Sequence, residues 1–201
     1  MIHKLLIASG NAHKITEIKQ ILEDCPIEVF GLKDVNFNVS EPIENGTTFK
    51  ENAKIKADAY TELFEGWILA DDSGIVVDAL DGDPGIFSAR YAGEDATDSD
   101  NREKLKIELK KLKLNMSSAH FVCSLCLIAP NREDIFYFEE HWKGLVNVEE
   151  KGEGGFGYDP MFYINDGEIS AAELSEHEKN AMSHRGLALK RLKEQSGELF
   201  K

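Results

Sequence analysis

The chain has 201 residues, 42% of them hydrophobic, which is enough to bury one good core, so we expect one compact domain over residues 1–201. Its formal net charge of −14 argues against nonspecific nucleic-acid binding, which needs a basic surface. No apolar run approaches the roughly 20 residues of a membrane span, and the start is too short for a signal peptide. We therefore expect a cytoplasmic protein that binds neither nucleic acid nor membranes.

The first segment predicts a strand, a glycine turn and a helix. Lys4–Ala8 is a short apolar strand, Ser9-Gly10-Asn11 is the turn, and isoleucines then recur at helical spacing until the helix ends near Pro26. The start of such a helix favours a bound anion, and Lys14 adds a positive charge there. The alternative is a tight strand-to-helix connection with Asn11 in the left-handed conformation.

A second helix is marked by Thr48 and Glu51, which have the spacing of a capping box. Its inner face carries Phe49, Ala53, Ala57, Tyr60 and Phe64. The acidic stretch Ser40–Gly46 precedes this helix. Its Glu44, together with Asp72 further along, can complete an oxygen-ligand set for Mg²⁺, although an acid at a helix start also simply favours the helix dipole.

Two adjacent carboxylates, Asp71 and Asp72, lie between apolar stretches and are followed by Ser73-Gly74, which lets the backbone turn. Burying a carboxylate is costly unless cations or hydrogen bonds compensate. A pair of aspartates at a strand end therefore indicates a metal or general-base site. An Asx-type turn between two strands is the alternative.

The second half of the chain predicts a mixed sheet with further helices. One helix spans Asp98–Leu114, and its leucines at 105, 109 and 112 face inward while its lysines face solvent. Residues 120–148 form long antiparallel strands, in which Trp142 packs in the core or an interface. A last helix begins at Ser183 and fades at Gln195–Gly197.

Three cysteines, Cys25, Cys123 and Cys126, argue against a disulfide framework because their number is odd. Cys123 and Cys126 form a C-x-x-C pattern, but it lies in a strand-like apolar run where positions three apart face opposite sides of a sheet. We expect both thiols to pack in the core, with a redox or zinc site as the alternative.

The loop Gly154–Pro160 joins flexible backbone to two aromatic residues and an acid, a composition that suits stacking a flat base and contacting its edge. Further on, His184 and Arg185 fall in the first turn of the last helix. Cations there oppose the helix dipole, so they cost stability unless they contact a ligand or an acid.

Six motifs occur in one order along nearly the full chain. They are the Ser9-x-Asn11-x-x-Lys14 turn, Glu51-Asn52-Ala53 with Lys56-Ala57, Ala70–Gly74, Pro84-Gly85 with Ser88–Tyr91, Gly155–Pro160 and Ser183–Gly186. Together they resemble the inosine triphosphate pyrophosphatase family, specifically its bacterial-type dITP/XTP pyrophosphatases.

The resemblance implies an α/β fold: an elongated central mixed sheet flanked by helices in two lobes, with a deep substrate groove between them, assembled as a homodimer. It implies Mg²⁺-dependent hydrolysis of ITP, dITP, XTP and dXTP to the monophosphate and pyrophosphate, which removes deaminated purines from the nucleotide pool. Two alternatives stay open. One is a nucleotide-binding regulator without catalysis, and the other is a related Mg²⁺-dependent house-cleaning pyrophosphatase with a different base preference.

By the same resemblance, Asp72 is the catalytic residue and a metal ligand, and Glu44 is the second metal ligand. The implied substrate-binding residues are Ser9, Gly10, Asn11, Ala12, His13, Lys14, Lys56, Ser73, Phe156, Gly157, Tyr158, Asp159, Lys179, His184 and Arg185. The first eight would hold the triphosphate and the others the base: Phe156 by stacking, and the backbone around Gly157–Asp159 with Lys179, His184 and Arg185 at the base edge.

Overall fold

The computed structural model describes residues 2–35, 37 and 42–200. The chain divides into two compact units, each built from separated segments: unit 1 is Met1–Asp72, Cys123–Glu140 and Arg185–Lys201, and unit 2 is Ser73–Val122 and His141–His184. The expectation of a single domain stays a prediction. Ser40 and Glu41, from the acidic stretch before the second helix, lie outside the described residues.

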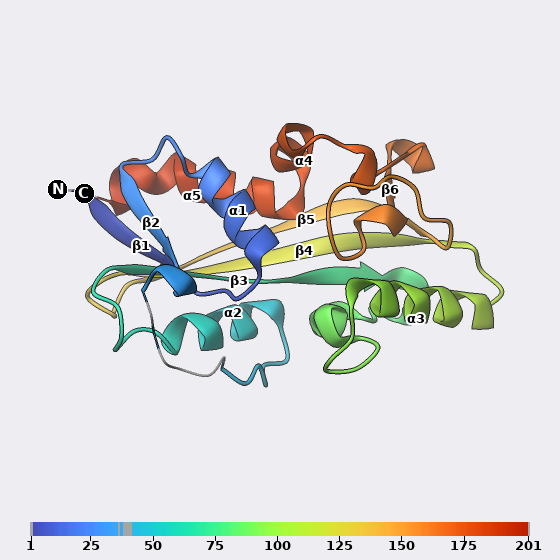
Figure 1. Cartoon of the computed structure of the whole chain (residues 1–201), viewed down its shortest axis with the longest axis horizontal. Helices are drawn as coiled ribbons and strands as arrows, with labels where there is room; N and C mark the ends of the chain where they lie inside the picture. Colours follow the sequence, from blue (N-terminus) through green and yellow to red (C-terminus); the bar gives the residue numbers. More distant parts are fainter. Residues whose placement is uncertain (1, 36, 38–41, 201) are drawn as a thin grey trace. The chain divides into compact units, whose positions relative to one another are not determined.

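Within the described residues, seven strands form one sheet in the order β2-β1-β3-β4-β5-β6-β7 (Figure 1). The strands are β1 (His3–Ile7), β2 (Ile27–Gly31), β3 (Trp67–Val77), β4 (Met116–Ile128), β5 (Ile135–Asn147), β6 (Phe162–Ile164) and β7 (Ile169–Ser170). β1 pairs in parallel with β2 and β3, whereas β6 pairs antiparallel with β5 and β7. The predicted mixed sheet is therefore confirmed.

Five α-helices accompany these strands in the described part of the chain. They are α1 (Ala12–Ile21), α2 (Phe49–Asp58), α3 (Asp98–Lys111), α4 (Glu176–Met182) and α5 (His184–Leu199). Short 3₁₀ helices occur at Leu32–Asp34, Asp78–Leu80, Gly85–Arg90, Asp159–Met161, Asn165–Gly167 and Ala171–Glu173. Helix α1 begins at an Asn11 cap with φ of −78° and ψ of 110°, so the left-handed alternative for Asn11 is wrong.

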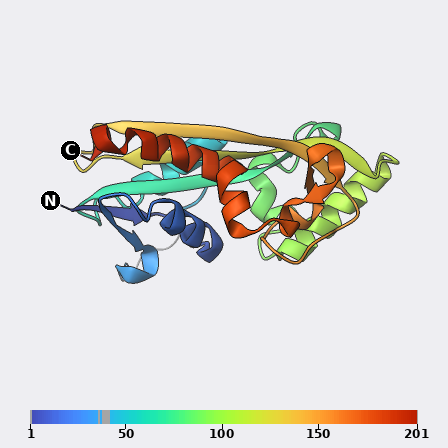
Figure 2. The same ribbon diagram turned by 90° about the horizontal axis from the view of Figure 1, so that it is seen from above.

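In unit 1, helices cover both faces of the sheet. α1 and α5 pack on one face, where Ile18 and Leu189 join Leu5 in one buried cluster. α2 packs on the other, where Ala53 joins Leu6 in a second cluster. Consecutive strand residues point to opposite faces, so neighbours such as Leu5 and Leu6 enter different clusters. Figures 1 and 2 show α1 beside α5, and Figure 1 shows α2 across the strands from them.

The same alternation sorts the two cysteines of the C-x-x-C pattern. Cys123 belongs to the cluster under α1 and α5, and Cys126 belongs to the cluster under α2. Both are free thiols and fully buried. The prediction of core packing on opposite sides of the sheet is confirmed.

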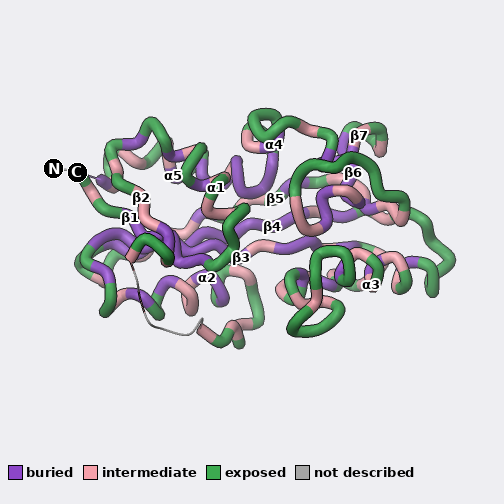
Figure 3. Tube along the Cα trace, viewed as in Figure 1, coloured by how far each residue is buried: buried purple, intermediate pink, exposed green. Residues whose placement is uncertain are grey.

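In unit 2, the core is built from α3 and aromatic residues of the strands. Leu105 and Leu109 of α3 are buried in one cluster with Phe121, Trp142 and Phe162. The Trp142 and Phe162 ring centroids are 5.0 Å apart. Figure 3 shows buried segments of the strands and exposed stretches on α3. The core position predicted for Trp142 is confirmed.

Four helix ends differ from the prediction. α1 ends at Ile21 rather than near Pro26. α3 stops at Lys111, because Lys113 takes a left-handed φ of 60° and the Leu114 N–H returns to the Leu109 carbonyl at 3.0 Å. Leu112 is consequently 49% exposed rather than inward-facing. α5 continues through Gly197 to Leu199, because the end of this helix packs on the core of unit 1. α2 stops at Asp58, yet Tyr60 and Phe64 beyond it are buried as predicted.

Strand β3 runs without a break through Asp71, Asp72, Ser73 and Gly74, so both the strand end and the Asx turn predicted there are wrong. The strand can carry two buried acids because cations meet both of them. Gly74 serves close packing rather than a turn: a Cβ there would lie 2.4 Å from the Gly85 carbonyl oxygen and 2.4 Å from the Ser88 hydroxyl.

Candidate active site

The turn between β1 and α1 is organised by its own side chains. Asn11 Oδ1 accepts hydrogen bonds from the backbone N–H groups of His13 at 3.0 Å and Lys14 at 3.1 Å. The backbone N–H of Asn11 donates to Ser9 Oγ at 3.2 Å. The cap therefore already occupies two of the amides that a helix start offers to an anion. An anion at this turn would depend on side chains such as Lys14 or would displace the cap.

Asp71 of β3 is fully buried in unit 1 and meets two cations. Lys14 Nζ of α1 lies 2.5 Å from Asp71 Oδ1, and Arg185 Nε of α5 lies 2.8 Å from Oδ2. Arg185 NH1 also reaches Glu17 at 2.5 Å, and Cys123 Sγ lies 3.2 Å from Asp71 Oδ2. The cluster thus joins residues from α1, β3, β4 and α5.

The ionisation of Asp71 follows from these partners. Burial alone would raise its pKa, but the charges of Arg185 and Lys14 and their hydrogen bonds together hold the pKa of Asp71 well below its usual range. Burial beside the Asp71 carboxylate raises the pKa of the Cys123 thiol well above its usual value. Asp71 is therefore a carboxylate, and Cys123 is a protonated thiol.

Asp72, the next residue, faces a different helix. Lys56 Nζ of α2 lies 2.7 Å from Asp72 Oδ1 and 3.3 Å from Glu44 Oε2. Among the described residues, the buried Asp72 Oδ2 has no hydrogen-bond partner. Burial raises the pKa of Asp72, and the charges of Lys56 and Lys14 offset this only in part. Burial also opposes the charge of Lys56, but Asp72 and Glu44 outweigh it and raise the pKa of Lys56.

The donors around Asp72 fit a hard divalent cation. Asp72 and Glu44 share Lys56, which leaves one excess negative charge and an unpartnered carboxylate oxygen. Mg²⁺ takes one or two carboxylates and completes its shell with water and substrate phosphates. The described residues contain no group of three or more histidine, cysteine or acidic side chains arranged to hold a metal. This part of unit 1 therefore suits Mg²⁺ with substrate better than a closed transition-metal cage.

In unit 2, the predicted base loop is tightly organised around Asp159. Asp159 Oδ2 accepts from the Phe156 amide at 2.8 Å and from Lys179 Nζ at 2.7 Å. Lys179 Nζ also lies 4.5 Å from the centre of the Phe156 ring, within cation–π range. Gly155 has a φ of 72°, and a Cβ there would meet Asp159 Oδ2 at 2.2 Å, so this position requires glycine.

The backbone of this loop is already hydrogen-bonded inside the protein. The Gly157 N–H donates to Asp98 Oδ2 at 2.7 Å, and the Gly157 carbonyl accepts from Arg102 NH1 at 2.8 Å. The buried Tyr158 hydroxyl donates to the Ser88 carbonyl at 2.8 Å. Gly157 and Tyr158 thus have structural bonds where the sequence suggested contacts to a base edge.

The two basic residues of the last motif have different surroundings at the start of α5. The His184 ring stacks on Phe121, with centroids 4.7 Å apart and planes within 8°. Arg185 forms the buried ion pairs with Asp71 and Glu17. We expected an acid or a ligand to compensate a cation at this helix start, and for Arg185 the acids Asp71 and Glu17 do so. Its guanidinium lies in the Asp71 cluster, and a role at the base edge stays a prediction.

The predicted site residues divide between the units. Unit 1 holds Ser9, Gly10, Asn11, Ala12, His13, Lys14, Glu44, Lys56, Asp72 and Arg185, and unit 2 holds Ser73, Phe156, Gly157, Tyr158, Asp159, Lys179 and His184. Within them, the structure brings Glu44, Lys56 and Asp72 together, and likewise Phe156, Asp159 and Lys179.

Two residues that organise these groups have no role in the sequence-based prediction: Glu17 binds Arg185 in unit 1, and Arg102 holds the loop in unit 2. Asp71 was predicted only as one of the aspartate pair of a metal or general-base site, and in the structure it holds Lys14 and Arg185. Glu17 lies three residues after Lys14, a spacing that places both side chains on one face of α1 and could have marked it. Nothing local in the sequence links Arg102 to Gly157.

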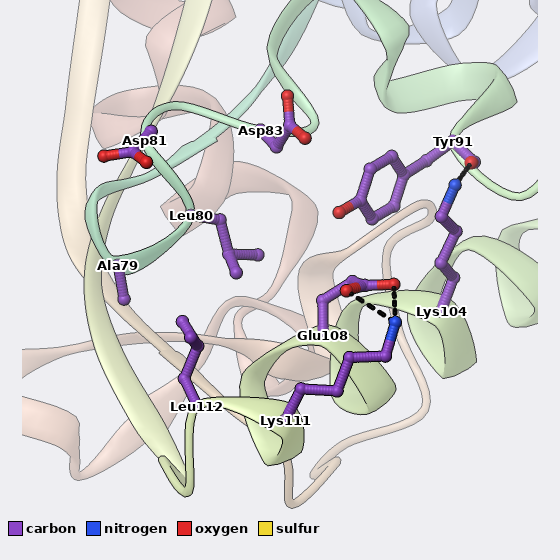
Figure 4. A pocket seen from close by; sticks show the side chains of 9 residues that line it. All are labelled: Ala79, Leu80, Asp81, Asp83, Tyr91, Lys104, Glu108, Lys111 and Leu112. Carbon is purple, nitrogen blue, oxygen red and sulfur yellow. Dashed lines mark hydrogen bonds and ion pairs between the residues drawn. The ribbon is translucent and has the colours of Figure 1, made fainter.

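Unit 2 also has an open pocket of about 470 Å³, shown in Figure 4. It is lined by Ala79, Leu80, Asp81, Asp83, Tyr91, Lys104, Glu108, Lys111 and Leu112. Lys104 Nζ donates to the Tyr91 carbonyl, and Lys111 pairs with Glu108 at 2.8 Å. This pocket shares no residue with the predicted site.

None of the helices in the described ranges combines the length and apolar character that crossing a membrane requires.

Comparison with known proteins confirms the family resemblance and the mixed α/β fold. The sequence profile of the Ham1 family matches residues 5–195. A dITP/XTP pyrophosphatase from Halalkalibacterium halodurans is 47% identical over 93% of this chain and 95% of its own length. A protein of the same name from Streptococcus pneumoniae is 44% identical over 94% of each. The solved structure of a HAM1 protein from Coxiella burnetii superposes with a TM-score of 0.87 at 38% identity, covering 98% of this chain and 99% of that one. The chain belongs to the Ham1 family.

Proposed function

We propose that this protein hydrolyses the deaminated purine nucleotides ITP, dITP, XTP and dXTP to the monophosphate and pyrophosphate. Its curated relatives bear the name dITP/XTP pyrophosphatase. The observation that carries the proposal is the buried Asp72, whose Oδ2 has no hydrogen-bond partner among the described residues while Lys56 holds its other oxygen at 2.7 Å. Such an oxygen suits a metal ion or the proton of an attacking water.

The triphosphate would be bound by the ammonium groups of unit 1. Lys14 and Lys56 are both largely buried and each contacts an aspartate, so their positions are fixed before a substrate arrives. These ammonium groups, together with a bound divalent cation, are needed because the net charge of −14 repels a polyanion. Preformed ammonium groups stabilise the phosphate oxygens as their charge shifts during the reaction.

We assign the metal to Asp72 and Glu44, the two carboxylates that Lys56 joins. Mg²⁺ bound there would neutralise phosphate oxygens and lower the pKa of a coordinated water. Calorimetric titration of Mg²⁺ into the wild type and Glu44→Gln tests the assignment. Equal affinity in both proteins would remove Glu44 from the metal site.

In the chemical step, a water oxygen forms a bond to the α phosphorus while the bond from that phosphorus to the α,β-bridging oxygen breaks. Pyrophosphate leaves, and the proton of the water passes to Asp72. Asp72 Oδ2, the oxygen opposite the one that Lys56 holds, would accept this proton. Asp71, whose pKa is held low, stays ionised and positions Lys14.

Base recognition would fall to unit 2. Phe156 offers a ring for stacking, and Lys179 and His184 offer donors for a purine 6-keto oxygen. Adenine carries a donor amino group at that position, so it would leave a buried donor unpaired. Such a mismatch can cost up to ~10⁴-fold in rate.

The decisive test is turnover of ITP, XTP, dITP, ATP and dUTP with Mg²⁺ in water enriched in ¹⁸O. We expect ITP and XTP to be hydrolysed far faster than ATP, with pyrophosphate as the first product and the label in the monophosphate. The Asp72→Asn protein, purified in the same way, controls for contaminating phosphatases. Equal ATP turnover would refute the base assignment, orthophosphate as first product would refute the attacked bond, and a preference for dUTP would favour the pyrimidine alternative.

The proposal includes a homodimer, which rests on the family resemblance alone, and a cytoplasmic location, which rests on the sequence. Light scattering coupled to gel filtration tests the dimer, and a monomer at micromolar concentration would contradict it.

A further inference from the structure

The backbone of Gly157 in the base loop is held by helix α3 at both its N–H and its C=O. Its N–H donates to Asp98 Oδ2 at 2.7 Å, and its C=O accepts from Arg102 NH1 at 2.8 Å. Asp98 and Arg102 are four residues apart, so both project from one face of the first turns of α3. Two side chains of one rigid helix thus hold the two successive peptide planes that meet at the Gly157 Cα.

The arginine of this pair is itself anchored. Arg102 Nε lies 3.1 Å from Glu150 Oε2, and Lys106 Nζ lies 2.7 Å from Glu150 Oε1. Burial would raise the pKa of Glu150, but hydrogen bonds from Lys106 and Arg102 hold it below its usual value. α3 therefore contacts the chain at Glu150 and again at Gly157, on either side of the glycine-rich segment that leads to Phe156.

The turn does not need this external support to close. The Asp159 N–H already donates to the Phe156 carbonyl at 3.1 Å, and Asp159 Oδ2 already binds the Phe156 N–H. Asp98 adds a second hydrogen bond to the Phe156–Gly157 peptide, and Arg102 holds the next one, the Gly157–Tyr158 peptide. Gly157 has a φ of 60° and no atom would lie within 4 Å of an added Cβ, so no side-chain packing restrains this position and the hydrogen bonds from α3 carry that role.

We propose that Asp98 and Arg102 are positioning residues for base recognition, which hold the two peptides on either side of the Gly157 Cα so that Phe156 and Lys179 form a purine-binding face before substrate arrives. The inference rests on the proposed function, because it assigns the base to this loop. A loop that is ordered in advance binds its ligand without the entropy cost of ordering. The substrate-dependent effect should therefore appear in KM for the nucleotide.

Two measurements on Asp98→Ala and Arg102→Gln test the proposal. In substrate-free protein, we expect hydrogen exchange at the Gly157 amide to accelerate at least ~10-fold in Asp98→Ala, because the amide loses its acceptor. With ITP, we expect both variants to raise KM about 10-fold while kcat stays within about twofold. The inhibition constant of tripolyphosphate, which has no base, should not change.

Three further proteins separate positioning from general damage. Asp98→Asn keeps a carbonyl acceptor for the Gly157 amide and should restore KM and slow exchange. Glu103→Ala, also on α3, removes a side chain that pairs with Lys106 and should leave both measurements unchanged. If Asp98→Ala fails to fold because Asp98 begins α3, Arg102→Asn joins Arg102→Gln and the KM measurement decides.

Each outcome decides the proposal. Hydrogen exchange at the Gly157 amide that stays slow in Asp98→Ala would show that the Asp98 contact does not hold the loop. Fast exchange with an unchanged KM would show that the contacts from α3 do not serve base binding. Either result would overturn the proposal. If the wild type hydrolysed ATP and ITP equally, the proposed selectivity would fail, but a KM increase for both nucleotides would still support a purine-positioning role.

Discussion

The two groups of candidate residues are stabilised in different ways. In unit 1, buried side chains of opposite charge form ion pairs, as in the Asp71–Arg185 contact of 2.8 Å. In unit 2, the loop around Phe156 keeps its shape mainly through hydrogen bonds between backbone and side chains, such as the Gly157–Asp98 bond of 2.7 Å. The chemistry of unit 1 therefore depends on ionisation, and recognition by unit 2 depends on shape.

The sharpest contrast inside unit 1 is between two consecutive residues. Asp71 and Asp72 point to opposite faces of β3, and the pKa of Asp71 is lowered whereas the pKa of Asp72 is raised. Asp71 meets two cations and uses both of its oxygens, but Asp72 meets one ammonium group and keeps Oδ2 unpartnered among the described residues. Their different surroundings assign Asp71 to structure and Asp72 to chemistry.

The largest effect on stability should come from Asp71→Asn. A neutral amide would leave the buried Arg185 and Lys14 without their shared counter-charge, which we expect to cost about 3–5 kcal/mol of unfolding free energy. Urea unfolding at neutral pH measures it. A loss below about 1 kcal/mol, the size typical of an exposed pair, would contradict the structural role of Asp71.

The pH dependence of that loss has a defined sign. Because its folded pKa is depressed, Asp71 contributes stability that is fully present above its unfolded pKa of about 3.9 and is lost as the pH falls through the folded value. The gap between wild type and Asp71→Asn should therefore shrink below about pH 4. Asp72 acts oppositely, since its raised pKa means that its ionisation costs stability and that protonation relieves the cost.

Asp72→Asn should lower activity without lowering stability. We expect kcat for ITP to fall at least ~10²-fold, because an amide neither binds Mg²⁺ as well nor accepts the proton of water. The melting temperature should stay the same or rise, since an unfavourable buried charge is removed. Asp58→Asn, at an exposed pair with Lys54, is the matched control and should leave kcat unchanged. Near wild-type turnover in Asp72→Asn would remove it from the reaction.

Phe156→Ala, in unit 2, should change KM for the nucleotide rather than kcat. Loss of base stacking is worth about 1–3 kcal/mol, so KM for ITP should rise roughly 5- to 150-fold. Inhibition by tripolyphosphate should stay unchanged, because Phe156 is assigned to the base. The half-buried Phe136, which packs near Trp67 in unit 1, provides a Phe→Ala control. Weaker inhibition by tripolyphosphate in Phe156→Ala would contradict the assignment of the triphosphate to unit 1 and the base to unit 2.

The smallest expected effect compares two helix caps. Thr48 Oγ1 accepts from the Glu51 amide at the start of α2, which carries Lys56, and Ser175 Oγ accepts from the Glu178 amide at the start of α4, which carries Lys179. Thr48→Ala and Ser175→Ala should each cost about 1 kcal/mol of stability. Thermal melts and nucleotide kinetics should then show whether Thr48→Ala affects kcat and Ser175→Ala affects KM.

Local patterns in the sequence predicted local structure well. The cap at Thr48, the turn after β1 and the opposite faces of Cys123 and Cys126 all follow from spacing over a few residues, and the structure confirms them. Helix α4 was not predicted, although Ser175 and Glu178 form a capping box that could have marked it. Strand β2 was missed because five residues give a weak pattern without their partner β1.

Features that depend on distant residues could not be predicted in this way. The unbroken course of β3 requires cations beside Asp71 and Asp72, and Arg185 is 114 positions from Asp71 in the chain. No local spacing tells that the guanidinium turns toward that aspartate. The family motifs named Arg185 and Asp72 without showing their contacts, and only the structure separates the surroundings of the two aspartates.

Unit 1 is made of three segments that are separated in the sequence, so its parts become available for folding at different times during translation. The cluster under α2 is complete once the ribosome has made Tyr137, but the cluster under α1 and α5 also needs Leu192 and Phe200. One face of the same strands is therefore completed before the other. Until α5 leaves the ribosome, the apolar residues of unit 1 that α5 covers stay open to chaperones and to other nascent chains.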